Sequence, residues 1–230
     1  MVNDLASRLL EEITVQTAFT LRIGSLEIAV AESTVVMWII IGVLAALSLF
    51  FTHDLKVRNP SRRQLMIESF VSWIDKFIDG MLGEEGRPYA TYMAVVLIYI
   101  MFANAIGLFG MKPPTKDLNQ TVALAFMSIV LVEAAGIRKK GVKGWLKSFS
   151  EPVAAVTPIN ILELVIRPLS LCMRLFGNVL GAYIIMELIK MVIPVVIPLA
   201  LSFYFDLFDG AIQAYVFVFL TCLYIKEAVE

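Results

Sequence analysis

The sequence predicts an all-α integral membrane protein with about five transmembrane helices and one amphipathic helix at the membrane interface. Of its 230 residues, 59% are hydrophobic, and the mean hydropathy is +0.82, whereas a soluble domain is roughly 45–50% apolar. The apolar residues collect in stretches of about 20 residues or more, the length that crosses about 30 Å of hydrocarbon. We therefore expect one polytopic membrane domain over residues 33–230, preceded by an extramembrane arm over residues 1–32.

The first three elements are the arm, a span and the amphipathic helix. The arm contains the alternating stretch FTLRIGSLEIAV, and the first span covers residues 33–52. A charged loop separates this span from residues 61–82, where apolar residues recur roughly at helical spacing and charged residues occupy much of the remaining surface. A helix of that kind lies in the membrane interface or packs on neighbouring helices, and it does not span.

Four further spans follow along the chain. They are expected over residues 89–109, 120–137, 157–190 and 194–225. A straight helix over the third of these ranges would be about 50 Å long at about 1.5 Å per residue. Because that length exceeds the bilayer, the segment must tilt steeply, kink or fold back as a hairpin.

The distribution of Lys and Arg predicts the orientation of the chain. The loops after the first and third spans, 53–63 and 138–147, are rich in both residues, whereas the loop between the second and third spans has only Lys112 and Lys116. Cytoplasmic loops carry the excess of positive residues. We therefore expect the N-terminus outside and, after five crossings, the C-terminus in the cytoplasm. The net charge of −1 gives no sign of a nucleic-acid partner.

Cysteine, histidine and phosphate-binding patterns give no indication of a cofactor. Cys172 and Cys222 lie inside apolar spans and are interpreted as small buried apolar residues. The single histidine, His53, stands in a loop beside Asp54 and is expected to be solvated, so the chain offers no metal-ligand cluster. The sequence contains no Gly-x-x-x-x-Gly-Lys-Ser/Thr loop. We expect no cofactor and no enzyme activity of the chain on its own.

A stripe of polar residues runs along the 157–190 span. At about 100° per residue, Glu163, Arg167, Arg174 and Asn178 fall within an arc of roughly 60°. A stripe of this kind faces a partner or a water-filled path, because lipid does not tolerate it. An alternative remains for its first two members, because Glu163 and Arg167 are four residues apart and could simply pair near the interface.

The last span carries a second polar stripe. Asp206, Asp209 and Gln213 are spaced i, i+3 and i+7 and are expected to share one face of the helix. Glu187 and Lys190 lie near the outer end of the preceding span, and we interpret them as marking the membrane boundary.

Arg174 is the residue that most needs an explanation. It is not close to the end of any span, and no acidic residue lies three or four positions away. An arginine stays charged and costs at least a few kcal/mol at mid-bilayer. Its counter-ion must therefore come from elsewhere, either from Asp206 or Asp209 or from a carboxylate on another subunit.

Four stretches of the sequence together resemble subunit a of the F-type ATP synthase. They follow one another in the order of that family and cover most of the chain after residue 33. They read KVRNPSRRQLMIES (56–69), NAIGLFGMKPPTKDLNQTVALAF (104–126), SLCMRLFGNVLGA (170–182) and DLFDGAIQAYVFVFLTCLYI (206–225).

The resemblance implies an ion-translocating stator. In this family two long, steeply tilted helices lie against a ring of c subunits, each with an ion-binding carboxylate at mid-membrane, and two offset half-channels reach the ring from the two sides. Arg174 matches the arginine of the family that holds the deprotonated carboxylate and blocks leakage. The implied partners are the c-subunit ring, the peripheral stalk b subunits, the soluble ATPase head indirectly, and membrane lipid, in a bacterial cell membrane.

The resemblance also assigns roles to other polar residues. Asn178 and Gln213 match polar positions near the arginine, and Ser170 matches a small polar position on its cytoplasmic side. Glu163 matches an acidic residue near the cytoplasmic access path, and Asp206 matches a His or acidic position of the outer half-channel.

One position departs from the family pattern. Many relatives carry an acidic or histidine side chain where this chain has Tyr183. With tyrosine at this position, Asp206, together with Asp209 or Glu187, is expected to supply the titratable carboxylates of the outer half-channel.

Two other functions are weighed against the stator. A stand-alone secondary transporter or channel would also contain intramembrane charges, but the chain shows no inverted internal repeat. A non-transporting anchor would have no reason to keep two polar stripes in its most apolar half. Whether the coupling ion is H⁺ or Na⁺ stays open, because the c subunit carries the site that distinguishes them.

Overall fold

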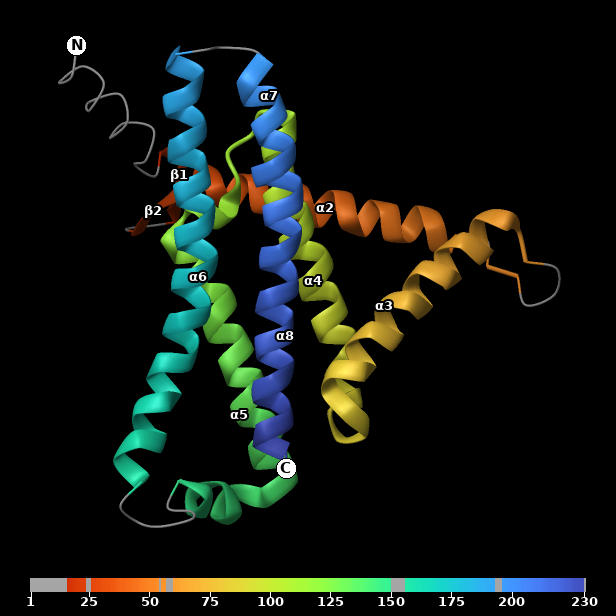
Figure 1. Ribbon diagram of the computed structural model, residues 1–230, viewed down its shortest axis with the longest axis vertical. Coiled ribbons are helices and arrows are strands. Elements are labelled where there is room, and N and C mark those ends of the chain that lie inside the picture. Colours follow the sequence, from red (N-terminus) through yellow and green to blue (C-terminus); the bar gives the residue numbers. More distant parts are fainter. Residues whose placement is uncertain are drawn as a thin grey trace. The chain divides into compact units, whose positions relative to one another are not determined.

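The computed structural model describes residues 16–23, 26–53, 55–56, 60–149, 156–192 and 196–229. Three expectations fall partly outside these ranges. They concern residues 1–15 of the arm, residues 57–59 of the first basic loop, and the start of the last span at Pro194. Most of the chain that is described is helical (Figure 1).

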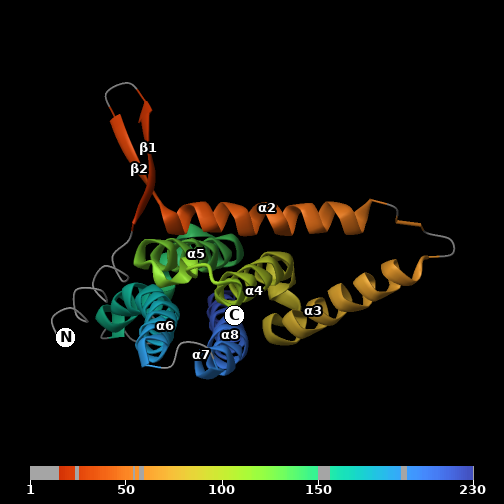
Figure 2. The same ribbon diagram turned by 90° about the horizontal axis from the view of Figure 1, so that it is seen from above.

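The end of the arm forms a two-stranded antiparallel hairpin. Strand β1 (Thr17–Ile23) pairs with β2 (Leu26–Ala31), and Figure 2 shows the pair leading into the first long helix. The register places Arg22 opposite Glu27, and the two side chains form an exposed ion pair. The apolar alternation noted in this stretch has the period of two that is typical of a strand.

The amphipathic helix follows the first spanning segment along the chain. That segment is α2 (Glu32–Thr52), followed by α3 (Arg62–Gly86), a short 3₁₀ turn η1 (Arg87–Tyr89) and α4 (Ala90–Ala105). Helix α3 begins after Ser61, whose hydroxyl accepts a hydrogen bond from the Gln64 N–H at 3.2 Å and caps the helix.

The segment expected as a loop after the third span is helical. Two 3₁₀ turns, η2 (Ile106–Phe109) and η3 (Pro114–Lys116), lead into α5 (Leu118–Ser148). The basic residues expected in a loop after Ile137 instead continue this helix, because Lys and Arg are good helix formers. The break occurs at Gly141, whose φ of 71° is the left-handed conformation that glycine adopts readily.

The 157–190 segment is one continuous helix. Helix α6 (Thr157–Val192), labelled in Figure 1, has 36 residues and is about 54 Å long. Pro168 lies inside it. The possibility of a hairpin within this segment is therefore excluded. The chain ends with α7 (Val196–Ser202), a π-helical segment η5 (Phe203–Asp209) and α8 (Gly210–Val229).

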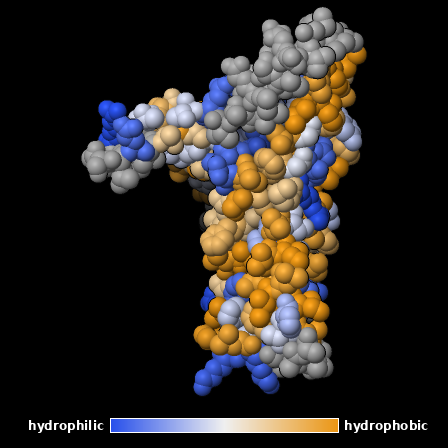
Figure 3. All heavy atoms as spheres, turned by 90° about the vertical axis from the view of Figure 1, so that its left-hand side faces the viewer, coloured by the Kyte–Doolittle hydropathy of each residue, from blue (hydrophilic) through white to orange (hydrophobic). Residues whose placement is uncertain are grey.

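Five segments of the described chain are long and apolar enough to cross a membrane, which confirms the predicted fold class. They are Glu32–Thr52, Arg62–Phe109, Leu118–Ser148, Thr157–Lys190 and Ile197–Val229. Large apolar side chains on them are exposed, among them Leu49, Phe126 and Val165, and much of the face in Figure 3 is apolar. Exposed apolar surface on this scale is expected to face lipid. The protein is a multi-pass membrane protein.

Two compact units divide the chain. The first unit consists of Met1–Gly42, Tyr99–Thr121 and Met173–Gln213, and the second of Val43–Ile98, Val122–Cys172 and Ala214–Glu230. Each unit contains parts of several helices and buries its own apolar side chains, such as Ile100 and Leu175 in the first and Ile78 and Val218 in the second.

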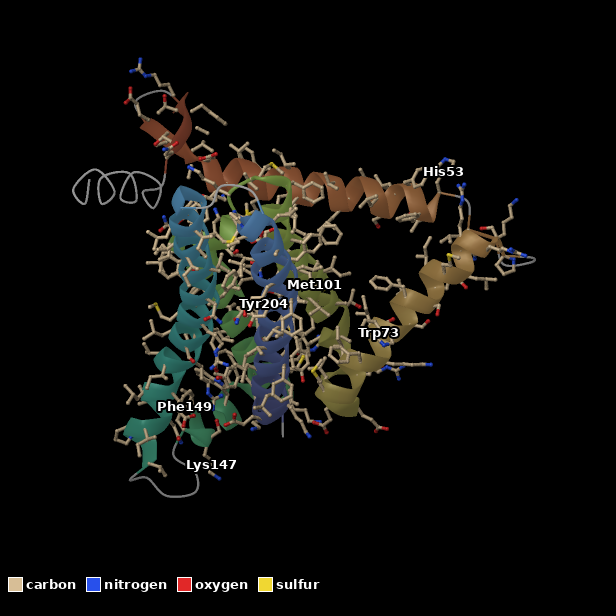
Figure 4. The ribbon with its side chains drawn as sticks, turned by 45° about the horizontal axis from the view of Figure 1, so that its top comes forward. His53, Trp73, Met101, Lys147, Phe149 and Tyr204 are labelled. Carbon is tan, nitrogen blue, oxygen red and sulfur yellow. The ribbon has the colours of Figure 1, made fainter. Side chains whose placement is uncertain are left out.

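Two smaller predictions from the sequence are confirmed within the second unit. Cys172 and Cys222 are both buried and form no disulfide with any described residue, as expected of small apolar residues. His53 is exposed directly after the last residue of α2 (Figure 4), as expected of a solvated residue.

Candidate functional site

A cavity of about 500 Å³ with charged residues in its walls lies within the first unit. Its walls come from the end of α4 and the connection after it, from the second half of α6, and from α7, η5 and the first residue of α8. The charged residues that line it are Lys112, Glu187, Lys190, Asp206 and Asp209. A space of this size with charged groups in its walls can hold water.

The two aspartates project from the π-helical segment. Asp206 and Asp209 both line the cavity, whereas Gln213 is buried and is not among the lining residues. A π-helix bonds i to i+5, and the Gly210 N–H accordingly contacts the carbonyl of Phe205. The wider turn changes the angle between successive side chains. Asp206, Asp209 and Gln213 therefore do not share one face of the helix, as they would in an ideal α-helix.

An aromatic cluster accompanies the aspartates on the same segment. Tyr204, labelled in Figure 4, has its ring centroid 5.2 Å from that of Phe205 and 5.7 Å from that of Phe208. π-Helical turns occur frequently at functional sites, where they re-aim side chains.

Hydrogen bonds connect the cavity wall to the start of α8. The Asn104 amide donates from Nδ2 to the carbonyl of Gly210 at 3.2 Å, and its Oδ1 accepts from the Thr115 hydroxyl at 2.7 Å. Asn104 and Thr115 are both buried. Sequence reasoning misses this pair as site residues, although both residues lie in the 104–126 stretch that resembles the family.

Glu187 and Lys190 line the cavity as well, although we expected them to mark the membrane boundary. The Lys190 ammonium lies 2.7 Å from the Glu187 carboxylate. Tyr183, one turn earlier on α6, has the Lys116 ammonium 4.0 Å from its ring centroid, which is a cation–π contact.

The start of α5 is tied to the start of α2 within the same unit. The Ser33 hydroxyl donates to Asp117 Oδ2 at 2.5 Å, and the Gln120 amide donates to the Thr34 hydroxyl at 3.1 Å. The Asp117 Oδ1 accepts from the Asn119 N–H at 3.0 Å. These bonds fix the connection that forms one wall of the cavity.

Arg174 is exposed, and among the described residues it makes no hydrogen bond or ion pair. Neither Asp206 nor Asp209, the two internal counter-ions considered for it, is paired with it. Asn178, one turn later on α6, is also exposed, and no hydrogen bond connects Arg174 to Asn178 or Gln213 in the part of the chain with known placement. The exposed face of α6 therefore carries an uncompensated positive charge.

Arg167, in the second unit, has the opposite surroundings. It contacts the carboxylates of Glu163 and Glu227, each at 2.7 Å, and its guanidinium carbon lies 5.0 Å from the Tyr224 ring centroid. The pairing of Glu163 with Arg167 is the simpler of the two interpretations given for that stripe. Ser170, one turn after Arg167 on α6, is half-buried.

Metal-binding side chains do not gather anywhere in the described ranges, where no group of three His, Cys, Asp or Glu residues could hold an ion. Glu133, a polar residue of the third span, accepts a hydrogen bond from the Trp145 indole N–H at 2.8 Å. It belongs to the second unit and does not line the cavity.

Comparison with known proteins identifies the family. The family model described as ATP synthase A chain matches residues 34–226. The ATP synthase subunit a of Moorella thermoacetica is 36% identical over 200 residues, which cover 86% of this chain and 91% of that protein. ATP synthase subunit a 3 of Pelobacter propionicus is 34% identical over 207 residues, 88% of this chain and 89% of that protein.

A further relative carries the name of an ion. The protein named ATP synthase subunit a, sodium ion specific, from Propionigenium modestum is 32% identical over 186 residues, which cover 74% of this chain and 64% of that protein. The family match extends over most of the chain, and the polar residues of the cavity lie within it. The chain therefore belongs to the ATP synthase A chain family, the family of the F-type ATP synthase subunit a.

Proposed function

We propose that this membrane subunit of an F-type ATP synthase guides ions through two offset half-channels to and from carboxylates on a ring of c subunits. Arg174 faces the ring and prevents ions from passing directly between the half-channels. The observation that carries the proposal is the contrast on α6, where Arg167 is paired with two glutamates and the exposed Arg174 is not paired within the described chain.

The energetics favour a partner that comes from another chain. An uncompensated arginine at membrane depth costs at least a few kcal/mol, so it persists only where an opposite charge reaches it. A carboxylate at 4 Å would contribute about 4 kcal/mol at an effective dielectric near 20. That interaction is strong enough to displace an ion from the carboxylate and weak enough to be broken as the ring turns.

The cavity of the first unit is the proposed inner end of the outer half-channel. Asp206 and Asp209 would accept ions there, and Glu187 supplies a third carboxylate, since Tyr183 stands where many relatives have a titratable residue. Lys190 pairs with Glu187, which leaves the two aspartates as the carboxylates most available to an entering cation.

The path on the cytoplasmic side is proposed to pass Glu163 and Ser170. Glu163 keeps 47% of its side chain exposed although it is paired with Arg167, so water can still reach it. Asn178 and Gln213 are proposed to line the approach to Arg174.

The distribution of Lys and Arg supports an orientation with the N-terminus outside and the C-terminus in the cytoplasm of a bacterial cell. The proposed partners are the c-subunit ring, the peripheral stalk b subunits and, indirectly, the soluble ATPase head. The chain itself would do no ATP chemistry. The coupling ion is H⁺ or Na⁺, and one relative is named for sodium.

The test is ATP-driven ion pumping in inverted membrane vesicles that carry the complete complex. Arg174→Lys is expected to abolish pumping while the complex still assembles, because lysine presents a different donor at a different reach. Arg138→Lys is the matched control, since Arg138 is also exposed but lies on the basic part of α5. Pumping at the wild-type rate in assembled Arg174→Lys would refute the mechanism.

A further inference from the structure

We propose that Gly107 is a positioning residue for Asp206, because its missing side chain leaves the space that the Asp206 carboxylate occupies at the cavity wall. The inference rests on the proposed function, in which Asp206 accepts ions. It concerns a residue that the charge patterns of the sequence do not single out.

The backbone of Gly107 lies directly against the carboxylate of Asp206. A Cβ atom built on Gly107 would lie 2.7 Å from both Cγ and Oδ1 of Asp206 and 2.8 Å from its Oδ2. These distances are far shorter than a van der Waals contact of about 3.5 Å. The φ angle of Gly107 is not in the left-handed region, unlike that of the nearby Gly110. The position therefore requires glycine for space and not for its backbone conformation.

A second glycine, Gly210, makes the same kind of close contact in the opposite direction, with Asn104. A Cβ atom on Gly210 would lie 2.7 Å from the Cβ of Asn104, and the Asn104 amide donates to the Gly210 carbonyl at 3.2 Å. Each of the two segments thus contributes one glycine that accommodates a polar side chain of the other. Because Asn104 is buried and fixed by Thr115, the π-helical segment cannot simply move away from a methyl group added at Gly107.

The surroundings of Asp206 explain why packing has to position it. No hydrogen bond to its carboxylate is found among the residues of known placement. The charged groups around the same cavity are Lys190 and Glu187 from α6, Lys112 from the connection, and Asp209 from its own segment. A carboxylate that is held by shape keeps its oxygen lone pairs available, so it can take up and release a cation.

A double-mutant cycle tests the inference in the complete complex. Gly107→Ala is expected to lower ATP-driven pumping about tenfold or more, since a displacement of about 1 Å can cost up to about 100-fold. Gly80→Ala is the control, because a Cβ at Gly80 meets nothing within 4 Å. In an Asp206→Ala background, Gly107→Ala is expected to have no further effect, because the side chain that it displaces is gone.

The outcomes of the cycle are distinct. Wild-type pumping in Gly107→Ala, or an equal loss with and without Asp206, would overturn the inference. Wild-type pumping in Asp206→Ala alone would instead contradict the proposed role of Asp206, and the contact itself would then be judged by cross-linking.

Cross-linking gives a readout that does not depend on activity. A Cβ built on Gly107 would lie 2.7 Å from Cγ of Asp206, so the two Cβ positions are close enough for the separation of roughly 3.5–4.5 Å that a disulfide needs. Gly107→Cys with Asp206→Cys, in a chain with Cys172→Ala and Cys222→Ala, is expected to form an intramolecular disulfide on mild oxidation. Gly110→Cys with Asp206→Cys is expected to form none, because a Cβ at Gly110 meets nothing within 4 Å. No cross-link in the first pair, or equal cross-linking in both, would overturn the inference.

Discussion

Two arginines of α6, seven residues apart, illustrate how surroundings decide the role of a charge. Arg167 has 19% of its side chain exposed and is neutralised by Glu163 and Glu227. Arg174 is exposed and has no such pair within the described chain. Removing a charge that is paired within the chain affects mainly the stability of the fold. The exposed ion pairs of such a cluster contribute little to that stability. An exposed charge in a membrane-spanning helix is instead a candidate for contact with another subunit.

Asp206 is the residue on which the proposed outer half-channel depends most. Asp206→Asn keeps the shape of the side chain and removes the titrating group, so coupled transport is expected to slow and its pH profile to change. The measurement is ATP-driven pumping across the pH range in which the complex is active. Asp75→Asn, at an exposed position of α3, is the control and should behave as wild type. An unchanged pH profile in Asp206→Asn would count against its role.

The π-helical segment and the connection after α4 act together at the scale of elements. The segment turns two aspartates towards the cavity, and Asn104 bonds to the residue with which α8 begins. The polar pair of Asn104 and Thr115 therefore fixes the place at which the helix changes its hydrogen-bonding pattern.

Thr115→Val tests this fixation. The substitution leaves the Asn104 Oδ1 without its donor, and a buried acceptor without a partner costs about 1–3 kcal/mol. The thermal unfolding temperature of the purified complex should fall measurably. Thr221→Val is the matched control, because Thr221 is equally buried but its hydroxyl donates to the Phe217 carbonyl of its own helix, at 2.8 Å. Equal effects of the two substitutions would contradict the account.

The sequence predicted the helical elements better than their irregular parts. Five spans and the helix over 61–82 follow from apolar runs and helical periodicity, which burial in lipid enforces. The π-helical segment could not be predicted, because a change in the number of residues per turn leaves no mark on the amino-acid composition of the span. The hairpin of β1 and β2 was visible only as alternation, and a hairpin of this size is marginal by itself.

The candidate site was predicted in part for the same reason. Charged residues in apolar spans, such as Asp206 and Asp209, are conspicuous because they are costly there. Glu187 and Lys190 were assigned to the boundary, since distance along a helix does not show whether a residue faces a cavity. The contribution of Gly107 depends on a contact between segments about 100 residues apart, which no local pattern reports.

At the scale of the whole molecule, the chain is a membrane subunit of a larger machine. Its family and the five apolar segments of its described part make it the membrane stator of an F-type ATP synthase. The proposed mechanism needs a moving partner, because an arginine paired permanently within its own chain could not serve successive carboxylates.

The most direct test of this claim combines pumping and leakage in inverted vesicles that carry the complete complex. For Arg174→Ala, we predict normal assembly, loss of ATP-driven pumping, and faster decay of an ion gradient imposed without ATP. Arg138→Ala should match wild type in all three. Normal pumping in assembled Arg174→Ala, or a gradient that decays as slowly as in wild type, would contradict the role of Arg174 as the barrier between the half-channels.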